Sequence, residues 1–259
     1  MPSLQGKTAI VTGSSKGIGR GIALRLAKDG ARTVLCSRDG DALKKVAGEI
    51  ESHGGTAASI ALDLRVPDSP AKLAEFAVGK FGGIDIVVNN AGATKRGEFG
   101  TLTDEDWADG FALKFFGAMR LTRAAWPHLK ASKGSLLNIS GVGGRTPGSL
   151  FTIGGAVNAA LLSFTKAMAE TGIRDGVQVN TINPGWIRTG RFQTRIETVA
   201  KEEGIAVAEA ERHMVKAEKI TRVGEPEDIA ALVAFIVSPE GRLLQGALID
   251  MDGGSTKTI

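Results

Sequence analysis

The sequence predicts a doubly wound α/β fold built on one parallel sheet of seven strands flanked by helices. Short β-rich segments alternate along the 259 residues with longer segments that have helical spacing, and strands joined through helices form parallel βαβ crossovers. The strands are apolar throughout, which is typical of a sheet covered on both faces. The chain contains no Pro/Ser-rich linker, charge run or fixed-period repeat, so a single domain is expected over 1–259.

Each expected strand is a short run rich in β-branched and apolar residues, and each expected helix repeats its apolar residues at a spacing of three to four. The strands are expected at Thr8–Val11, Thr33–Cys36, Ala58–Leu62, Ile84–Val88, Ser135–Ile139, Val177–Ile182 and Ala247–Asp250. The helices are expected at Ile18–Asp29, Gly40–Ser52, Ala71–Phe81, Asp104–Lys130, Leu150–Thr171 and Pro226–Val237.

The composition excludes several classes of function. The chain has no tyrosine, so no mechanism can use a phenol as acid or base. One cysteine, Cys36, cannot form an intramolecular disulfide, and the three scattered histidines have no metal-ligand spacing, so no metal is expected. The net charge of +4 is spread along the chain and provides no footprint for nucleic acid or an anionic membrane.

The ends and apolar runs of the sequence favour a cytoplasmic protein. Residues Met1–Lys7 lack the apolar core of a secretion signal, and the longest apolar run, Ile229–Val237, is too short to cross a bilayer. A single cysteine fits a reducing compartment.

The strongest local motif is Thr12–Gly19, which lies between the first expected strand and the first expected helix. Glycines permit a tight turn and a close approach of the backbone to a pyrophosphate, which then lies at the helix N-terminus. Because the turn has a strand before it and a helix after it, it predicts a dinucleotide site. The candidate contacts in the turn are Gly13, Ser15, Lys16, Gly17, Ile18 and Gly19.

The end of the second strand indicates which dinucleotide binds. An acidic residue there would bind the ribose 2′-hydroxyl of NAD, but the chain has Cys36-Ser37-Arg38. Arg38 and Lys16 offer positive charge to a 2′-phosphate, and Ser37 offers a hydroxyl. NADP(H) is therefore the expected cofactor, the alternative being that both cations are solvated loop charges.

The stretch 190–222 is the only irregular insertion in the alternation. It follows the C-terminal end of a strand, where doubly wound folds bind their ligands. We therefore expect it to form a lid over the substrate site.

The chain resembles a short-chain dehydrogenase/reductase of the classical type, a Rossmann-type family. The resemblance covers the whole sequence and rests on six motifs in order, namely the turn Thr12–Gly19, Asp63-Leu64, Asn89-Asn90-Ala91-Gly92, Asn138-Ile139-Ser140, Asn183-Pro184-Gly185 with Thr189, and Asp252-Gly253-Gly254.

The resemblance implies further cofactor contacts and an assembly. It implies adenine contacts from Asp63 and Leu64, and ribose and nicotinamide contacts from Asn90, Ala91 and Gly92. Contacts to the carboxamide and its surroundings are implied for Pro184, Gly185, Ile187 and Thr189. By the habit of the family, it also implies a homotetramer or homodimer, with the helices 104–130 and 150–171 at a shared interface.

The same resemblance shows that the usual catalytic residues are changed. The family uses an Asn, a Ser, and the Tyr and Lys of a Tyr-x-x-x-Lys motif. At the matching positions this chain has Lys114, Gly141, Gly154 and Asn158. Gly141 and Gly154 can neither donate a proton nor steady a developing charge through a side chain. Ser140 is a poor substitute for the serine, because adjacent strand residues point to opposite faces.

Lys114 and Asn158 retain the residue types of the Asn–Lys pair with their positions exchanged. We therefore hypothesise that Lys114 occupies the centre of the site, where it anchors the cofactor and shuttles a proton if burial lowers its pKa. Asn158 would bind a ribose hydroxyl. The alternative is a lysine on the surface of its helix whose amino group reaches solvent.

Glycines at the two catalytic positions are expected to open volume beside the nicotinamide. The surrounding loops carry many cations, which favours an anionic small molecule such as a carboxylate, a phosphate or an acyl-CoA. These cations are Lys95, Arg96, Arg145, Arg188, Arg191 and Arg195. Three functions stay open: an oxidoreductase, a silent cofactor-binding or regulatory protein, and a lyase or isomerase without redox chemistry.

Overall fold

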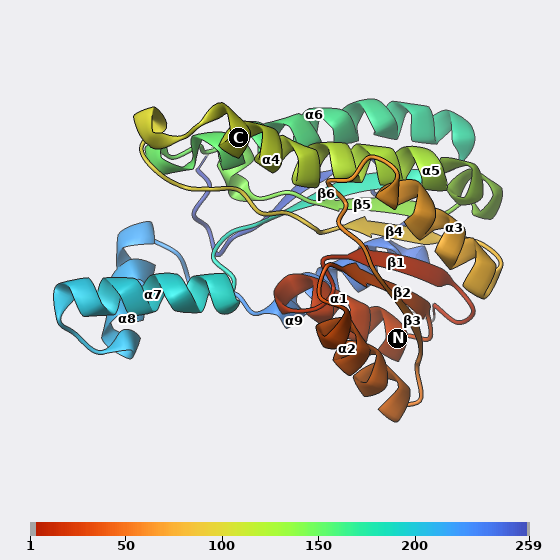
Figure 1. Ribbon diagram of the computed structural model, residues 1–259, viewed down its shortest axis with the longest axis horizontal. Helices are drawn as coiled ribbons and strands as arrows, with labels where there is room; N and C mark the ends of the chain where they lie inside the picture. Colours follow the sequence, from red (N-terminus) through yellow and green to blue (C-terminus); the bar gives the residue numbers. More distant parts are fainter. Residues whose placement is uncertain (1–3, 258–259) are drawn as a thin grey trace.

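The computed structural model describes residues 4–257 and shows one parallel sheet of seven strands in the order β3-β2-β1-β4-β5-β6-β7 (Figure 1). The predicted doubly wound fold is therefore confirmed. The predicted domain limits include residues 1–3 and 258–259, which lie outside the described residues. The strands are β1 (Thr8–Thr12), β2 (Arg32–Ser37), β3 (Thr56–Ala61), β4 (Ile86–Asn89), β5 (Ser135–Ile139), β6 (Gln178–Pro184) and β7 (Leu248–Met251).

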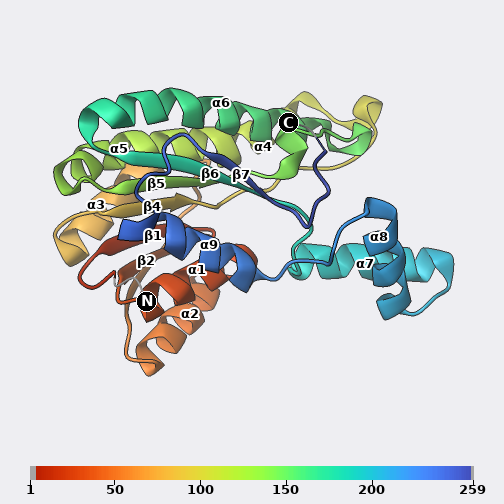
Figure 2. The same cartoon turned by 180° about the vertical axis from the view of Figure 1, so that it is seen from behind.

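Helices cover both faces of the sheet (Figures 1 and 2). One face carries α1 (Gly17–Lys28), α2 (Gly40–Ser52) and α9 (Pro226–Ile236). The other carries α3 (Ser69–Phe81), α5 (Gly117–Ser132) and α6 (Thr152–Asp175). The strands are apolar on both sides because each face packs against a helical layer.

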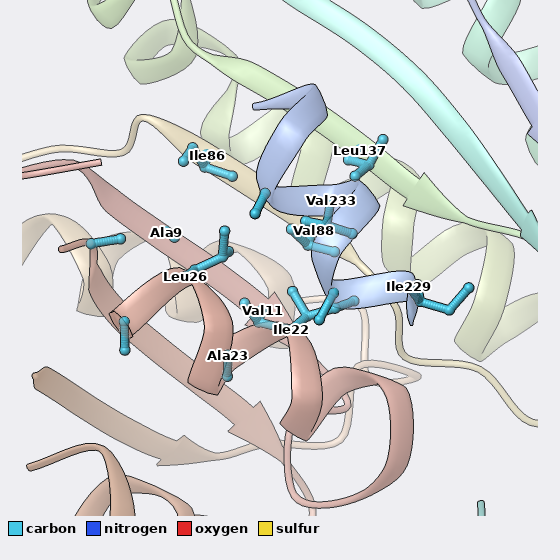
Figure 3. Packing of buried hydrophobic residues seen from close by; sticks show 14 of the residues in the cluster. Ala9, Val11, Ile22, Ala23, Leu26, Ile86, Val88, Leu137, Ile229 and Val233 are labelled. Carbon is cyan, nitrogen blue, oxygen red and sulfur yellow. The ribbon is translucent and has the colours of Figure 1, made fainter. Parts of the chain in front are cut away.

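The first strand shows how the two layers are built. Ala9 and Val11 point toward α1 and α9, where they pack among side chains that include Ile22 and Val233 (Figure 3). Ile10, between them, points to the opposite face and packs with the α3 and α5 layer. Successive strand residues alternate between faces, and burial of each large apolar side chain contributes about 1.5–3 kcal/mol.

The expected helix over 104–130 is interrupted, which corrects the prediction of one continuous helix. It divides into α4 (Asp104–Phe111), a π-helical turn at Ala112–Phe116, and α5. The wider turn contains Lys114. Periodicity alone missed this turn because the flanking residues keep their helical spacing. Such turns are frequent at functional sites.

The helix predicted over 150–171 also has different limits. A short 3₁₀ turn at Ser149–Phe151 precedes α6, which continues to Asp175. Within the described residues, Ser149–Asp175 is the one segment long and apolar enough to meet the criterion for a membrane span, with a mean hydropathy of 1.2. This segment of 27 residues is longer than Ile229–Val237, the apolar run that the sequence pattern indicates. Ile153, Val157 and Leu161 are buried on one face of this helix.

The insertion consists of two helices that stand away from the sheet (Figures 1 and 2). They are α7 (Gly190–Glu203) and α8 (Val207–Glu218), so the insertion is mostly helical. The helices have a small core of their own, formed by Phe192, Ile196, Ala200, Ala210 and Val223. A bridge between Ile187 and Gly224 joins the two chain segments at the base of the insertion.

Candidate active site

The strand order reverses between β1 and β4, and the loops that follow these strands meet at the same edge of the sheet. In open parallel sheets this reversal creates the crevice in which ligands bind. The glycine-rich turn after β1 and the segment Asn90-Ala91-Gly92 after β4 therefore lie side by side.

The glycine-rich turn can approach a phosphate closely. Gly13 and Gly17 have φ values of +65° and +56°, and a Cβ at Gly19 would lie 2.3 Å from the carbonyl oxygen of Gly13. Helix α1 begins at Gly17, and no side chain caps its N-terminus. The first N–H groups of the helix are thus available to an anion. This is the arrangement that a dinucleotide pyrophosphate requires.

Asn90 braces this turn from the neighbouring strand. Its Nδ2 donates to the carbonyl oxygens of Thr12 and Gly13, at 2.9 and 3.3 Å. The backbone N–H groups of Asn90 and Ala91 both donate to Thr12 Oγ1 at 2.9 Å. The Asn90 side-chain amide is therefore bonded to the backbone of the turn. The sequence motif did not predict that the Thr12 hydroxyl would accept two backbone hydrogen bonds from the neighbouring loop.

Arg38 lies at the exposed edge of the sheet, where a 2′-phosphate is expected. Its guanidinium is 4.0 Å from the carboxylate of Asp63, and 68% of its side chain is accessible. Ser37 Oγ accepts from the backbone N–H of Asp39 at 3.2 Å. Lys16 is also exposed. Arg38 and Lys16 are thus available to a ligand, whereas the Ser37 hydroxyl also donates to the Asp39 carbonyl oxygen at 3.3 Å.

Arg65 holds Asp63 in place. The Asp63 carboxylate accepts from the backbone N–H of Arg65 at 3.0 Å, and the Arg65 side chain also reaches Asp109 in α4. Burial by itself raises the pKa of Asp63, but hydrogen bonds from Arg65 and the charges of Arg65 and Arg38 outweigh it and lower the pKa. Leu64 is buried, so only its backbone remains for a cofactor contact.

Lys114 lies against Asn158 in the interior of the site. Its Nζ donates to Asn158 Oδ1 at 2.6 Å and to the carbonyl oxygen of Ser140 at 2.7 Å. The lysine stem passes over Gly92, where a Cβ would lie 2.8 Å from Lys114 Cδ. The side chain therefore points inward and does not extend along a helix surface into solvent.

The environment of Lys114 disfavours its charged form. Burial, and secondly the positive charge of Arg191, lower the pKa of Lys114 from 10.5 to about 7. The amino group can therefore lose or gain a proton near neutral pH. A protonated lysine carries three N–H donors, and two of them bind oxygens of this chain.

Side chains fill the space beside Gly141 and Gly154 that the sequence predicted to be open. A Cβ at Gly154 would lie 2.0 Å from Cζ of Phe151, because the phenylalanine ring occupies that space. A Cβ at Gly141, where φ is +150°, would lie 2.9 Å from Asn158 Nδ2. The prediction of an enlarged pocket at these positions is therefore wrong. The sequence carried a signal for this, since Phe151 precedes Gly154 by three residues, about one helical turn.

Ser140 does not replace the missing serine. Its Oγ is buried and donates to the backbone carbonyl of Asn158 at 3.1 Å. The hydroxyl thus joins β5 to α6, as expected for a side chain that points away from the site.

The rim cations divide into two groups. Lys95 pairs with Asp106, Arg145 with Asp250, and Arg188 with both Glu211 and Glu225. Among the residues from 4 to 257, Arg96, Arg191 and Arg195 have no carboxylate within 4 Å. The Arg191 guanidinium donates to the carbonyl oxygen of Gly92, next to the stem of Lys114. Half of the predicted cationic rim is therefore already neutralised.

The insertion also has a cavity of about 750 Å³ near its base. It is lined by α8 and the segment before α9, and includes Arg188, Lys219 and Glu225. None of the predicted cofactor residues lines it. This cavity is therefore distinct from the candidate site, which lies where the loops after β1 and β4 meet at the edge of the sheet.

Comparisons with known proteins agree with this fold. The family model described as enoyl-(acyl carrier protein) reductase matches residues 13–256. An uncharacterised oxidoreductase of Mycobacterium tuberculosis is 38% identical over 255 residues, covering 98% of this chain and 93% of the relative. The chain therefore belongs to the short-chain dehydrogenase/reductase family of oxidoreductases.

Two solved structures are similar over nearly the whole chain. L-sorbose reductase from Gluconobacter frateurii, complexed with NADPH and L-sorbose, has a TM-score of 0.95 and 32% identity, covering 99% of both chains. An actinorhodin polyketide ketoreductase with NADPH has a TM-score of 0.91 and 28% identity, covering 97% of this chain and 98% of the other.

The ring of Phe151 fills the space beside Gly154. We therefore predict that the effect of Gly154→Ala on the free energy of unfolding changes sign when Phe151 is also replaced by Ala. Gly154→Ala alone should destabilise the protein, because the overpacking cost of about 1–3 kcal/mol exceeds the helix-propensity gain of about 0.5–1 kcal/mol. In a Phe151→Ala background, the same change should stabilise. Urea unfolding measures both. Gly48→Ala in α2, where a Cβ meets no atom within 4 Å, is the control and should stabilise in either background.

The lowered pKa of Lys114 predicts a pH dependence of stability. Between about pH 7 and 10.5 the unfolded chain keeps the lysine proton that the folded chain has lost. The free energy of unfolding of the wild type should therefore rise with pH relative to Lys114→Met, by up to about 1.4 kcal/mol per unit. Below pH 7 the difference should be constant. Denaturant unfolding across this range measures it, with exposed Lys95→Met as the control. Parallel curves for wild type and Lys114→Met would contradict the lowered pKa.

Proposed function

We propose that the chain is an NADP(H)-dependent oxidoreductase that interconverts a small carbonyl compound and its alcohol, with Lys114 and Asn158 in place of the usual catalytic residues. The observation that carries this proposal is the bond from Lys114 Nζ to Asn158 Oδ1, beside the braced cofactor turn. NADPH-bound structures of similar enzymes support the choice of cofactor.

The residues present fit this cofactor. A side chain on Gly19 would fill the space against the turn, and the uncapped helix N-terminus offers N–H groups to the pyrophosphate. Arg38, Lys16 and Ser37 would hold the 2′-phosphate. Asp63, Leu64, Asn90, Ala91, Gly92, Pro184, Gly185, Ile187 and Thr189 stay proposed contacts to the remainder of the dinucleotide. When bound, the cofactor supplies the hydride that a carbonyl carbon accepts.

Lys114 would hold the proton that the carbonyl oxygen needs. Its charged form is destabilised by burial, so it yields a proton more readily than an exposed lysine. Asn158 and the Ser140 carbonyl fix the position of the amino group, and its remaining N–H is directed to a ligand. A positioned acid of this kind typically contributes about 10²–10⁴-fold to rate.

A second candidate is a cofactor-binding protein without turnover. The observation that favours it is Phe151, whose ring fills the space beside the position of the missing tyrosine and supplies no proton. NADPH binding without any NADPH oxidation would distinguish it from the oxidoreductase.

The location and the assembly are proposed from separate observations. The single cysteine, Cys36, is buried and cannot form an intramolecular disulfide, which suits a reducing compartment such as the cytoplasm. A homotetramer or homodimer is proposed from the family resemblance. Exposed Phe116, at the junction with α5, and Leu150, just before α6, supply apolar surface for such an interface.

The proposed 2′-phosphate site predicts a selective loss of NADPH affinity. Arg38→Ala should weaken NADPH binding about 10- to 100-fold, the equivalent of one or two charge-assisted hydrogen bonds. NADH binding should change less than about threefold. Cofactor fluorescence titration measures both. Equal loss for the two cofactors would contradict the role of Arg38.

The proposed role of Lys114 predicts a loss of turnover. Absorbance at 340 nm follows NADPH oxidation with a panel of ketones, keto acids and quinones. Lys114→Met should lower kcat by about 10²–10⁴-fold. Lys95→Met, whose lysine already pairs with Asp106, should leave it unchanged. Unchanged turnover and NADPH affinity in Lys114→Met would refute the exchanged-pair mechanism.

A further inference from the structure

Two arginines at the mouth of the site lie on aromatic rings. Arg96, in the loop after β4, lies with its guanidinium carbon 4.3 Å from the ring centre of Phe151. Arg195, in α7 of the insertion, lies 4.9 Å from the ring centre of Trp186. Such stacking orders a guanidinium while leaving its N–H edge available for a planar anion.

Among residues 4–257, neither guanidinium group has a carboxylate within 4 Å, and the charge of one acts on the other. Besides burial, the positive charge of Arg195 lowers the pKa of Arg96, so the two charges act on one another. The charge of Glu218 acts in the opposite direction, but it forms no ion pair with Arg96 within 4 Å. By contrast, the adjacent Lys95 and the nearby Arg188 are both held in salt bridges. Two like charges held close together favour a bound anion.

Arg96 is connected through packed side chains to Lys114, the proposed proton donor. Phe151, on which Arg96 lies, fills the space beside Gly154. A Cβ at Gly143 would contact both Phe151, at 2.9 Å, and Asn158 Nδ2, at 3.6 Å, so these two side chains line one wall. Asn158 in turn accepts from Lys114. Arg96 therefore lies at the outer end of a wall whose inner end is Lys114.

We propose that Arg96 and Arg195 bind the anionic end of the substrate, a carboxylate or phosphate, while its carbonyl group faces Lys114. The substrate class is therefore a carbonyl acid or its hydroxy acid. This inference rests on the proposed function for the carbonyl chemistry, whereas the anion site stands on the arginine geometry. Arg96 belongs to the main body and Arg195 to the insertion, so one anion bound to both connects the lid to the sheet edge.

Arg191 has a different role from Arg96 and Arg195. Its guanidinium donates to the Gly92 carbonyl and its charge acts on Lys114. It thus holds the loop after β4 beside the lysine stem. The anion site comprises the two stacked arginines, whose N–H edges are not used by a backbone carbonyl.

Anion binding to the NADPH-saturated protein tests this inference. With NADPH bound, the proposed 2′-phosphate site at Arg38 is already filled and does not compete for the probe. Calorimetry would measure succinate, inorganic phosphate and the neutral analogue succinamide. Arg96→Gln and Arg195→Gln should each weaken succinate binding about 10- to 100-fold, as expected for loss of a charge-assisted contact. Lys95→Gln is the matched control and should bind as the wild type does.

The outcomes separate the anion site from the proposed function. If phosphate binds and succinate does not, and binding depends on both arginines, the anionic group of the substrate is a phosphate and not a carboxylate. Absence of anion binding, equal binding of succinamide, or full affinity in both arginine variants would overturn the site. NADPH affinity, measured by fluorescence in every variant, tests the proposed function separately. If NADPH does not bind, the proposed function fails, and the same titrations on the free protein still judge the arginine site.

Discussion

The hydrogen bond between Lys114 and Asn158 is the interaction on which the rest of the site depends. It joins the π-helical turn, the end of β5 and the start of α6 through one amino group, which also binds the Ser140 carbonyl. Removing an ammonium group from water is costly unless oxygen acceptors replace the water. The two oxygens do so in part, and the remaining cost is visible as the lowered pKa of Lys114. Gly92 completes the arrangement, since any side chain there would collide with the lysine stem.

Gly141 and Gly154 have a packing role that follows from the same arrangement. Gly141 leaves space for the amide of Asn158, and Gly154 leaves space for the ring of Phe151. The ring of Phe151 also provides the surface on which Arg96 lies. The chemical consequence is a site with a single central titratable group and an apolar wall that leads outward to positive charge. Such a site suits a ligand with a carbonyl at one end and an anion at the other.

The charges around the mouth show why counting cations in a sequence overestimates a binding surface. Lys95, Arg145 and Arg188 meet carboxylates from other parts of the chain, and their charge serves the fold. Arg96 and Arg195 meet aromatic rings, which order the guanidinium without neutralising it. Solvated or paired cations add little to ligand affinity, whereas ordered and unpaired ones are prepared for an anion. The insertion, with its own small core, can position Arg195 as part of a rigid unit.

The sequence by itself determined the sheet, the order of the helices along it and the glycine-rich turn after the first strand. These follow from local patterns, because strand alternation, helical spacing and glycine-rich turns depend on residues that are near each other in the chain. Only the tertiary structure decided that Phe151 fills the space beside Gly154, that Lys114 lies in a π-helical turn and bonds to Asn158, and which arginines of residues 4–257 have no carboxylate within 4 Å. Lys114 and Asn158 are 44 residues apart, as are Arg65 and Asp109. Such contacts depend on how whole elements pack, and no local pattern records the volume that a distant side chain will occupy.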